Sequence, residues 1–251
     1  MSVVKSKEEV DKLRKCGDLV ARCLQMLKKR AMPGVSGLYL DMLAEEYIRD
    51  NKAEPAFKGY RGFPASICFS RNHVLVHGIP RKDDVIQDGD IITIDCGVQL
   101  NGSYGDAARC FGVGEITEEN KSLLYHTDKV LEAGIEKCRA GNHMGDVSYA
   151  IQKYTRKNKY YVVQQFCGHA IGTQMHEEPA VPNYGEPGAG ILLEPGMVFC
   201  VEPMLVKTQT RLGVLSDGWT IQTLDGSVCT HIEEMVLITD GDPEVISTIT
   251  D

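Results

Sequence analysis

The feature that most constrains the fold is a carboxylate inside an apolar β-strand. Residues 85 to 97 read Val-Ile-Gln-Asp-Gly-Asp-Ile-Ile-Thr-Ile-Asp-Cys-Gly, so β-branched residues surround Asp95. An unpaired carboxylate in a dry sheet costs several kcal/mol or stays protonated. Asp95 therefore needs a partner, which can be a hydrogen-bond network, an arginine or a metal ion.

The dipeptide Asn101-Gly102 predicts where the chain turns back after this strand. Asn-Gly favours a two-residue type I′ hairpin, whose register makes Asp95 and Asp106 diagonal neighbours on one face, roughly 7 Å apart at the backbone. Two carboxylates that close repel and raise one pKa unless a cation lies between them, which favours a divalent metal. The alternatives are a solvent-exposed Asp on an edge strand or an ion pair with Arg109.

The composition excludes several classes of partner. The chain has 251 residues, of which 43% are hydrophobic, and a formal net charge of -8. An acidic surface does not suit nucleic-acid backbones or anionic membranes. The start of the chain lacks a secretory signal, and no window offers the roughly 18 uncharged apolar residues of a membrane span. Nine cysteines without a C-x-x-C pair indicate reduced, mostly buried thiols. From the missing secretory signal, the missing membrane span and the reduced thiols, we expect a cytoplasmic protein.

Hydrophobic periodicity predicts four helices, and a capping box at Ser6 to Glu9 marks the start of the first. The expected helices cover residues 7 to 31, 37 to 51, 117 to 140 and 145 to 157. The expected strands cover residues 65 to 69, 74 to 76, 91 to 100, 104 to 113, 161 to 166, 197 to 207, 219 to 223 and 229 to 239. The order of helices, strands, helices, strands predicts an α+β fold and prompts a search for a repeat.

A weak internal repeat relates the two parts of the chain. Residues 86 to 95 can be laid on residues 193 to 202, which places Gly on Gly and Asp95 on Glu202. In both segments a turn glycine precedes the carboxylate by six residues. The match suggests two related halves that direct acidic residues to one shared centre.

Further metal-ligand types border apolar runs in the second half. Glu202 and the pair Glu233-Glu234 flank such runs, and His169 lies between glycines. Mixed carboxylate and imidazole ligands suit Mn, Fe, Co or Zn, and this many carboxylates can bridge two ions. The sequence lacks a nucleophile elbow, a P-loop, an H-E-x-x-H motif and a dinucleotide fingerprint. A nucleophilic pair of Cys167 with His169 is the weaker alternative.

Seven short segments, in this order, resemble those of type I methionine aminopeptidases, which are metallopeptidases. The segments are Val76–Pro80, Ile94–Gly97, Gly105–Asp106, Gly168–His169, Met175–Pro179, Val201–Met204 and the one at Glu233. The resemblance implies the pita-bread (creatinase/aminopeptidase) fold, with two pseudosymmetric halves and an antiparallel sheet covered by helices. It implies one catalytic domain over residues 1 to 251, with halves at about 1 to 140 and 141 to 251.

The resemblance also implies a set of metal ligands for two divalent ions, Co²⁺, Mn²⁺, Fe²⁺ or Zn²⁺. Asp106 and Glu233 would bridge the two ions, and the choice of Glu233 over Glu234 rests on the family pattern. The implied ligands are Asp95, Asp106, His169, Glu202 and Glu233.

The implied reaction is hydrolysis of the peptide bond after an N-terminal methionine, with a small penultimate residue preferred. Glu202 would accept a proton from water, His176 would stabilise the oxyanion, and His77 would bind the substrate near the scissile amide. The side-chain pocket that the resemblance implies consists of Tyr60, Phe63, Cys68, Met175 and Trp219. The implied partners are nascent polypeptide N-termini, with the ribosome near its exit tunnel as a candidate contact, and we expect a monomer.

Three positions depart from the family pattern. Ala170 stands where the family has Gly, Tyr104 where it has His, and Ala107 where a hydroxyl residue is usual. Because these positions adjoin ligands, they leave open an inactive or weakly active binding module of the same fold. A second alternative is another pita-bread aminopeptidase or proline peptidase, although the roughly 60 residues before the first expected strand leave little room for a separate N-terminal domain. His73, His126, His143 and His231 receive no role in the site.

Overall fold

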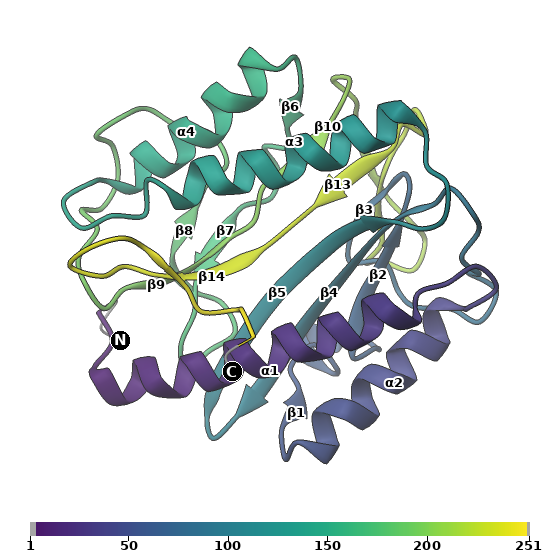
Figure 1. Ribbon diagram of the computed structural model, residues 1–251, viewed down its shortest axis with the longest axis horizontal. Helices are drawn as coiled ribbons and strands as arrows, with labels where there is room; N and C mark the ends of the chain where they lie inside the picture. The colour runs from purple at the N-terminus through teal and green to yellow at the C-terminus, as the bar shows by residue number, and fades with distance from the viewer. Residues whose placement is uncertain (1–3, 250–251) are drawn as a thin grey trace.

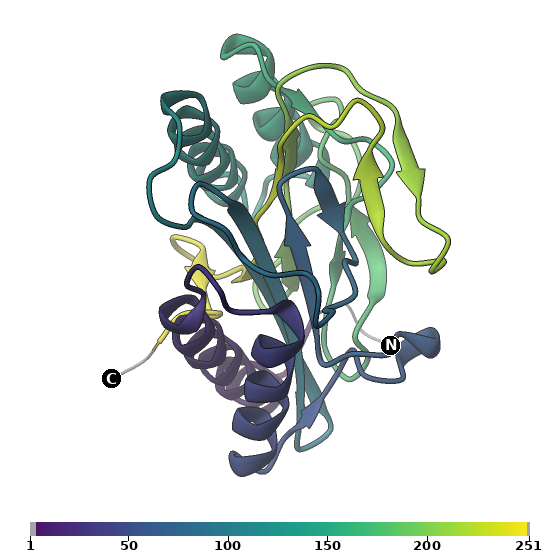
Figure 2. The same cartoon turned by 90° about the vertical axis from the view of Figure 1, so that its right-hand side faces the viewer.

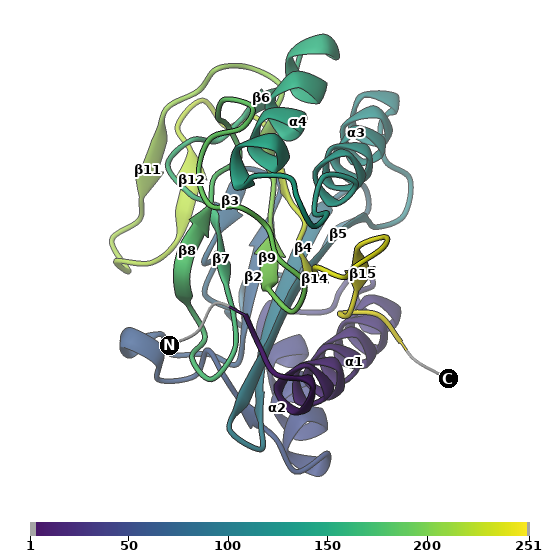
Figure 3. The same ribbon diagram turned by 90° about the vertical axis from the view of Figure 1, so that its left-hand side faces the viewer.

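The computed structural model describes residues 4–249, in which four helices lie along one side of the strands (Figures 2 and 3). In Figure 1, two helices lie above the long strands and two lie below them. The helices are α1 (Lys7–Arg30), α2 (Gly37–Asp50), α3 (Glu118–Ile135) and α4 (Met144–Lys157), and a short 3-10 helix η1 covers Tyr60–Gly62. Within these residues no helix is both long and apolar enough to cross a bilayer.

Within residues 4–249 the strands form four sheets. β4 pairs with β1, β2 and β5 in the first sheet, and the largest sheet has the order β15-β14-β9-β7-β8. Two three-stranded sheets have the orders β13-β10-β6 and β11-β12-β3. The strands are β1 (Glu54–Pro55), β2 (Ile67–Arg71), β3 (Val74–Val76), β4 (Ile91–Leu100), β5 (Ser103–Gly112), β6 (Tyr161–Val162), β7 (Gly168–Ala170), β8 (Glu177–Val181), β9 (Val198–Val201), β10 (Met204–Val206), β11 (Leu212–Val214), β12 (Ile221–Thr223), β13 (Cys229–His231), β14 (Glu234–Leu237) and β15 (Glu244–Val245).

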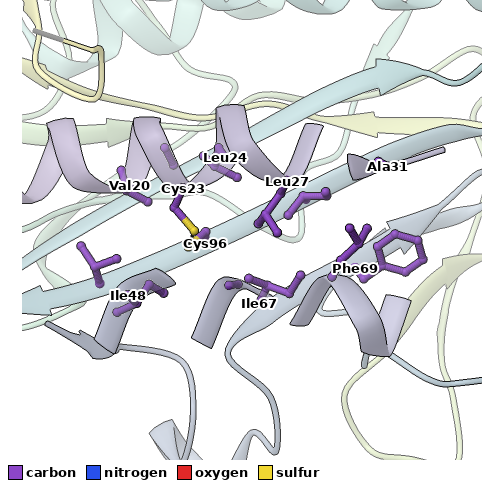
Figure 4. Close-up of a cluster of buried hydrophobic side chains, with 14 of the residues drawn as sticks. Val20, Cys23, Leu24, Leu27, Ala31, Ile48, Ile67, Phe69 and Cys96 are labelled. Carbon is purple, nitrogen blue, oxygen red and sulfur yellow. Dashed lines mark hydrogen bonds between the residues drawn. The ribbon is translucent and has the colours of Figure 1, made fainter. Parts of the chain in front are cut away.

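The first core lies between α1, α2 and the β4 sheet. The Ser6 side chain and the Glu9 side chain form the expected capping box at the start of α1. The apolar face of α1 contributes Leu24 and Leu27, which lie over the sheet in Figure 4, with Phe69 among the sheet residues. These three side chains are at most 1% exposed, so the helix is fixed chiefly by apolar burial.

The second core lies under α3 and α4. Val130 of α3 and Ile151 of α4 pack with Phe199 and Val236 from the β9 and β14 strands. Because α3 packs in this second core, we propose that the junction between the halves lies in the turn after β5, ahead of the position near residue 140 expected from the sequence.

The two segments of the internal repeat share the same backbone turn at a glycine. Gly89 and Gly196 both adopt left-handed φ values, 89° and 91°, and in each case a strand begins two residues later, β4 or β9. Each glycine N–H donates to a carbonyl beyond the end of the neighbouring strand: Gly89 to Val113 at 2.8 Å and Gly196 to Ile238 at 2.9 Å. Only glycine adopts this φ without strain, which explains why both segments need it.

The expected strands of the second half were too long. The run 197 to 207 forms β9 and β10, which are separated at Glu202 and Pro203, and the run 229 to 239 forms β13 and β14, which are separated at Ile232 and Glu233. Proline has no N–H for a ladder, so the first break has a direct cause. Short strands β7, β8, β11 and β15 were not expected, β6 is shorter than expected, and α3 ends at Ile135 instead of near residue 140. Both breaks leave a carboxylate at a strand end.

Candidate metal centre

The hairpin of β4 and β5 places two carboxylates together, in the predicted register. Asp95 pairs with Ala108 and Asp106 pairs with Gly97, so both carboxylates lie on one face. Their residues are only 9% and 3% exposed. On the other side of β4, Cys68 lies directly opposite Asp95 and therefore shares that face.

The second half supplies the other carboxylates and an imidazole. His169 is on β7, and Glu202 directly follows β9. Glu233 joins the two halves, because its N–H donates to Ala108 O at 3.1 Å and its carbonyl accepts from Ala108 N at 3.3 Å. Asp95, Ala108 and Glu233 thus form one row across three segments, and the small Ala108 side chain leaves room between the two acids.

The side chains of this centre meet at short distances. One donor atom from each of Asp106, His169, Glu233 and Cys200 lies within 4.8 Å of the others. His169 Nε2 is 3.6 Å from Asp106 Oδ2 and 3.9 Å from Glu202 Oε1. Asp95 lines the same cavity as Asp106, His169, Glu202 and Glu233, so the five residues that the resemblance implies as ligands lie together and come from both halves of the chain.

The hydrogen bonds in the centre favour a cation. His169 Nδ1 is 3.0 Å from the Ala170 carbonyl, which can only accept, so Nδ1 carries the proton and a neutral ring directs the Nε2 lone pair toward Asp106. Asp95 Oδ1, Asp106 Oδ1 and Glu233 Oε1 are buried and have no hydrogen-bond partner among the residues that the structure describes. Acceptors that face one another in a buried site need a positive charge, and these ligand types fit divalent ions.

The pKa values of the buried acids also indicate that the centre needs a cation. Burial raises the pKa of Asp95 to about 6. Burial, with the charge of Asp95, raises the pKa of Asp106 well above its ordinary value, and burial with Asp106 does the same for Glu233. Without a cation, the fold therefore disfavours the ionised state of these acids.

Arg109 does not neutralise the aspartates, so that alternative is wrong. Its guanidinium donates to Glu234 Oε2 at 3.0 Å and to the Glu233 and Ser247 carbonyls, both at 2.9 Å. Glu234 is further bound by the Ser247 hydroxyl. Arg109 thus separates the adjacent acids: Glu234 faces the arginine and Glu233 faces the centre. Since Asp95 and Asp106 are buried, the exposed-edge alternative is wrong as well.

A cavity of about 290 Å³ opens next to the carboxylates. Tyr60, Phe63, Cys68 and Trp219 line it, and Phe63 contacts Trp219 edge to face at 5.2 Å between ring centroids. Met175 lies further back, 2% exposed in the hydrophobic cluster behind this aromatic wall. One pocket therefore combines a buried acidic centre with an apolar cleft, as small-molecule and peptide side-chain sites do.

The two histidines singled out by the resemblance both lie in this cavity. His176 Nδ1 is 2.9 Å from the Tyr60 hydroxyl, and its ring lies 4.2 Å from that of His169. Burial lowers the pKa of His176 to about 3 and also lowers the pKa of His77. His77 has a left-handed φ of 56°, a strained conformation that is common at functional sites. Both rings are neutral in the protein.

Sequence reasoning missed several residues of the site. Phe57, Phe166 and His231 line the cavity, and Cys200 belongs to the ligand cluster. Cys200 has a usable signal, since it lies two residues before Glu202, and residues two apart in extended chain point to the same side. The exposed Cys167 reaches the cavity, but burial and nearby carboxylates raise the pKa of its thiol, which disfavours a nucleophilic thiolate.

The departures from the family pattern lie beside the centre and largely face away from it. Ala170 is 1% exposed and packs in the second core, and Ala107 packs in the first. Tyr104 packs partly buried against apolar residues of two smaller clusters, and its N–H donates to Gly172 O at 2.9 Å. The two alanines thus leave the ligand atoms untouched.

Comparison with known proteins places this geometry in a family. Residues 11–240 match the model of "Metallopeptidase family M24". A methionine aminopeptidase of Clostridium acetobutylicum is 47% identical over 98% of this chain and 99% of its own length. The crystal structure of methionine aminopeptidase from Thermotoga maritima aligns with a TM-score of 0.95 at 39% identity, over 98% of each chain. A prolidase from Pyrococcus furiosus, with a TM-score of 0.81 at 21% identity, covers 99% of this chain but 66% of its own and shows the shared fold alone.

Proposed function

The chain belongs to metallopeptidase family M24 and, within it, to the methionine aminopeptidases with their pita-bread fold, and we propose that it hydrolyses the bond after an N-terminal methionine. One observation carries the proposal: the unpartnered buried acids from both halves border a cavity with an aromatic wall. Such a site can hold a catalytic cation and one apolar side chain together.

The proposed holders of two divalent ions share a buried position and an oxygen or nitrogen donor directed at the centre. They are Asp95, Asp106, His169, Glu202 and Glu233. When bound, such ions polarise a carbonyl and lower the pKa of water. Asp106 and Glu233, which come from different halves and belong to the same ligand cluster, would bridge the two ions as the family resemblance implies.

Glu202 is the proposed general base. It lines the cavity, and its side chain is 12% exposed, so substrate and water can reach it. Its Oε1 faces His169, which leaves Oε2 on the other side of the carboxylate. The Glu202 carboxylate is thus both accessible to water and held in one orientation, as a general base requires.

His176 and His77 are proposed to bind the substrate around the scissile bond. The Tyr60 hydroxyl can donate to His176 Nδ1, and the neutral ring then has Nε2–H free to donate to the substrate carbonyl oxygen as negative charge develops there. His77 contacts Trp219 and Phe166 edge to face, at 6.2 and 5.8 Å between ring centroids, so its ring is held at the apolar wall. It is suited to bind the substrate amide.

The cavity supports methionine as the first residue of the substrate. The wall of Tyr60, Phe63, Cys68 and Trp219 is apolar and adaptable to a flexible thioether. A small penultimate residue is the proposed preference, as the family resemblance implies. Nascent polypeptide N-termini in the cytoplasm are the proposed substrates, the ribosome near its exit tunnel is a proposed contact, and a monomer is the proposed state. Nine free thiols support a reducing compartment.

The test uses the purified protein before and after dialysis against a chelator. Met-Ala-Ser should be cleaved by the metal-loaded protein, Met-Leu-Ser far more slowly, and neither after dialysis. Added Co²⁺ or Mn²⁺ should restore cleavage, and Fe²⁺ and Zn²⁺ complete the series. Full activity of the metal-free protein, or preference for a Gly-Pro dipeptide over Met-Ala-Ser, would contradict the proposal.

A further inference from the structure

His231 is a buried histidine at the proposed catalytic base. It is 2% exposed, lines the cavity, and places Nε2 at 3.4 Å from Glu202 Oε2. Its Nε2 has no hydrogen-bond partner among residues 4–249. A buried polar nitrogen without a partner is costly, so its position beside a carboxylate calls for an explanation.

The backbone of His231 is held firmly in place. β13 pairs with β10, which brings His231 opposite Met204, two residues beyond Glu202. The Thr93 hydroxyl of β4 donates to the His231 carbonyl at 3.3 Å. The backbone of His231 is therefore held by both halves of the molecule, at a position from which its side chain reaches Glu202.

The two oxygens of Glu202 face different imidazoles. Oε1 lies 3.9 Å from His169 Nε2, whereas Oε2 lies 3.4 Å from His231 Nε2. His169 Nε2 carries a lone pair, because its Nδ1–H donates to Ala170 O, so a neutral His169 cannot donate to Glu202. The imidazole of His231 is thus the ring positioned to donate a hydrogen bond to this carboxylate.

We propose that His231 is a positioning residue, whose Nε2–H donates to Glu202 Oε2 and thereby directs Oε1 toward the Asp106 and His169 side. The separation of 3.4 Å is longer than a formed N–H···O bond, and a small rotation of the carboxylate closes it. Hydrogen bonds at catalytic groups are often long without substrate and tighten in the complex. The inference rests on the proposed role of Glu202 as ligand and base.

Three variants separate a hydrogen-bonding role from a packing role. His231→Leu keeps much of the volume without a donor, and His231→Gln keeps a donor that can reach Glu202. His73→Gln, at an exposed histidine outside the cavity, is the matched control. Melting of each chelated protein checks folding. If the Leu variant does not fold, His231→Asn replaces it, since its shorter amide falls short of the carboxylate.

Two readouts decide the matter. Calorimetric titration with Mn²⁺ alone should show an affinity loss of about 10-fold or more for His231→Leu, the usual effect of removing a partner of a metal ligand. Its kcat should fall with KM unchanged, whereas His231→Gln and His73→Gln should stay within about threefold of the parent. Parent-like affinity and kcat in His231→Leu, or an equal loss in His231→Gln, would overturn the proposal. A parent protein that binds Mn²⁺ without cleaving Met-Ala-Ser would instead refute the proposed function, and the affinities would still judge His231.

Discussion

The two halves contribute to one centre by different structural means. In the first half, two ten-residue strands joined by a tight turn carry Asp95 and Asp106 in continuous register. In the second half, His169 lies in a three-residue strand next to a register shift, and Glu202 lies just beyond a four-residue strand. Local pairing fixes the first pair of ligands, whereas packing between distant segments fixes the others.

At the metal centre, a backbone bridge between Ala108 and Glu233 connects the two halves. Ala108 pairs with Asp95 on one side and exchanges two hydrogen bonds with Glu233 on the other. A regular hairpin thus serves as the frame against which the irregular half is aligned. The comparison predicts that loss of a ligand from either half weakens metal binding. It also predicts that the ligands differ in their effect on the catalytic rate.

The largest effect is expected when one bridging ligand is removed from either half. Asp106→Asn and Glu233→Gln each keep size and remove a charged donor from the cluster. Loss of a hydrogen-bond partner of a metal ligand lowers affinity or activity by up to about 100-fold. Loss of a ligand itself should lower metal affinity and kcat/KM by more than that. Calorimetry and Met-Ala-Ser cleavage measure both. If one variant retains parent-like affinity, the centre belongs to one half alone.

A smaller and asymmetric effect is expected at the repeat-related pair, Asp95 and Glu202. Glu202→Gln removes the proposed proton acceptor, so kcat should fall by about 10²-fold or more even at saturating metal. Asp95→Asn should act mainly on metal affinity, and excess Mn²⁺ should restore much of its turnover. Rate measurements against metal concentration distinguish the two. Near-parent turnover of Glu202→Gln would move the base to another residue.

The pH dependence of stability should reveal the acids of both halves. Asp95 has a pKa of about 6, and the pKa values of Asp106 and Glu233 are raised well above their ordinary values, so these acids stay protonated to higher pH in the folded than in the unfolded chain. Their favourable contribution is present below the ordinary carboxyl pKa and is lost as pH rises through the folded-state values. Metal binding replaces these protons. The melting-temperature gap between loaded and chelated protein should therefore widen as pH rises through about 6, the pKa of Asp95. A constant gap would contradict the unpartnered state of these acids.

The smallest effect is expected at Ala170, where the chain departs from its family. Its methyl group packs in the second core and is 1% exposed, so Ala170→Gly removes packing and not a ligand contact. The variant should lose about 0.5 to 1 kcal/mol of unfolding free energy. Urea denaturation measures this. A tenfold change in Mn²⁺ affinity would show that this position tunes the centre.

The sequence predicted the first half of the site from local rules. The Asn101-Gly102 turn fixes the register of β4 and β5, and alternation along each strand then places Asp95 and Asp106 on one face. The repeat of Gly89 and Gly196 was also visible, because each left-handed turn requires glycine.

The second half could not be derived in the same way. His169, Glu202 and Glu233 were identified by family resemblance, because their strands are short and pair with segments distant in sequence. His231 was missed for the same reason: its place beside Glu202 depends on the pairing of β10 with β13. Met175 was expected in the pocket, but sequence alone cannot distinguish the aromatic wall from the layer packed behind it.

The most direct test of the shared centre is a crystal structure of the Mn²⁺-loaded protein with an anomalous difference map. Two peaks are predicted, both within ligand distance of carboxylate oxygens of Asp106 and Glu233. One of them should also touch His169, and crystals of Asp106→Asn should show both peaks weakened. A map without peaks between these residues, or with peaks bound by ligands from one half only, would contradict the account that the two halves together form the metal site.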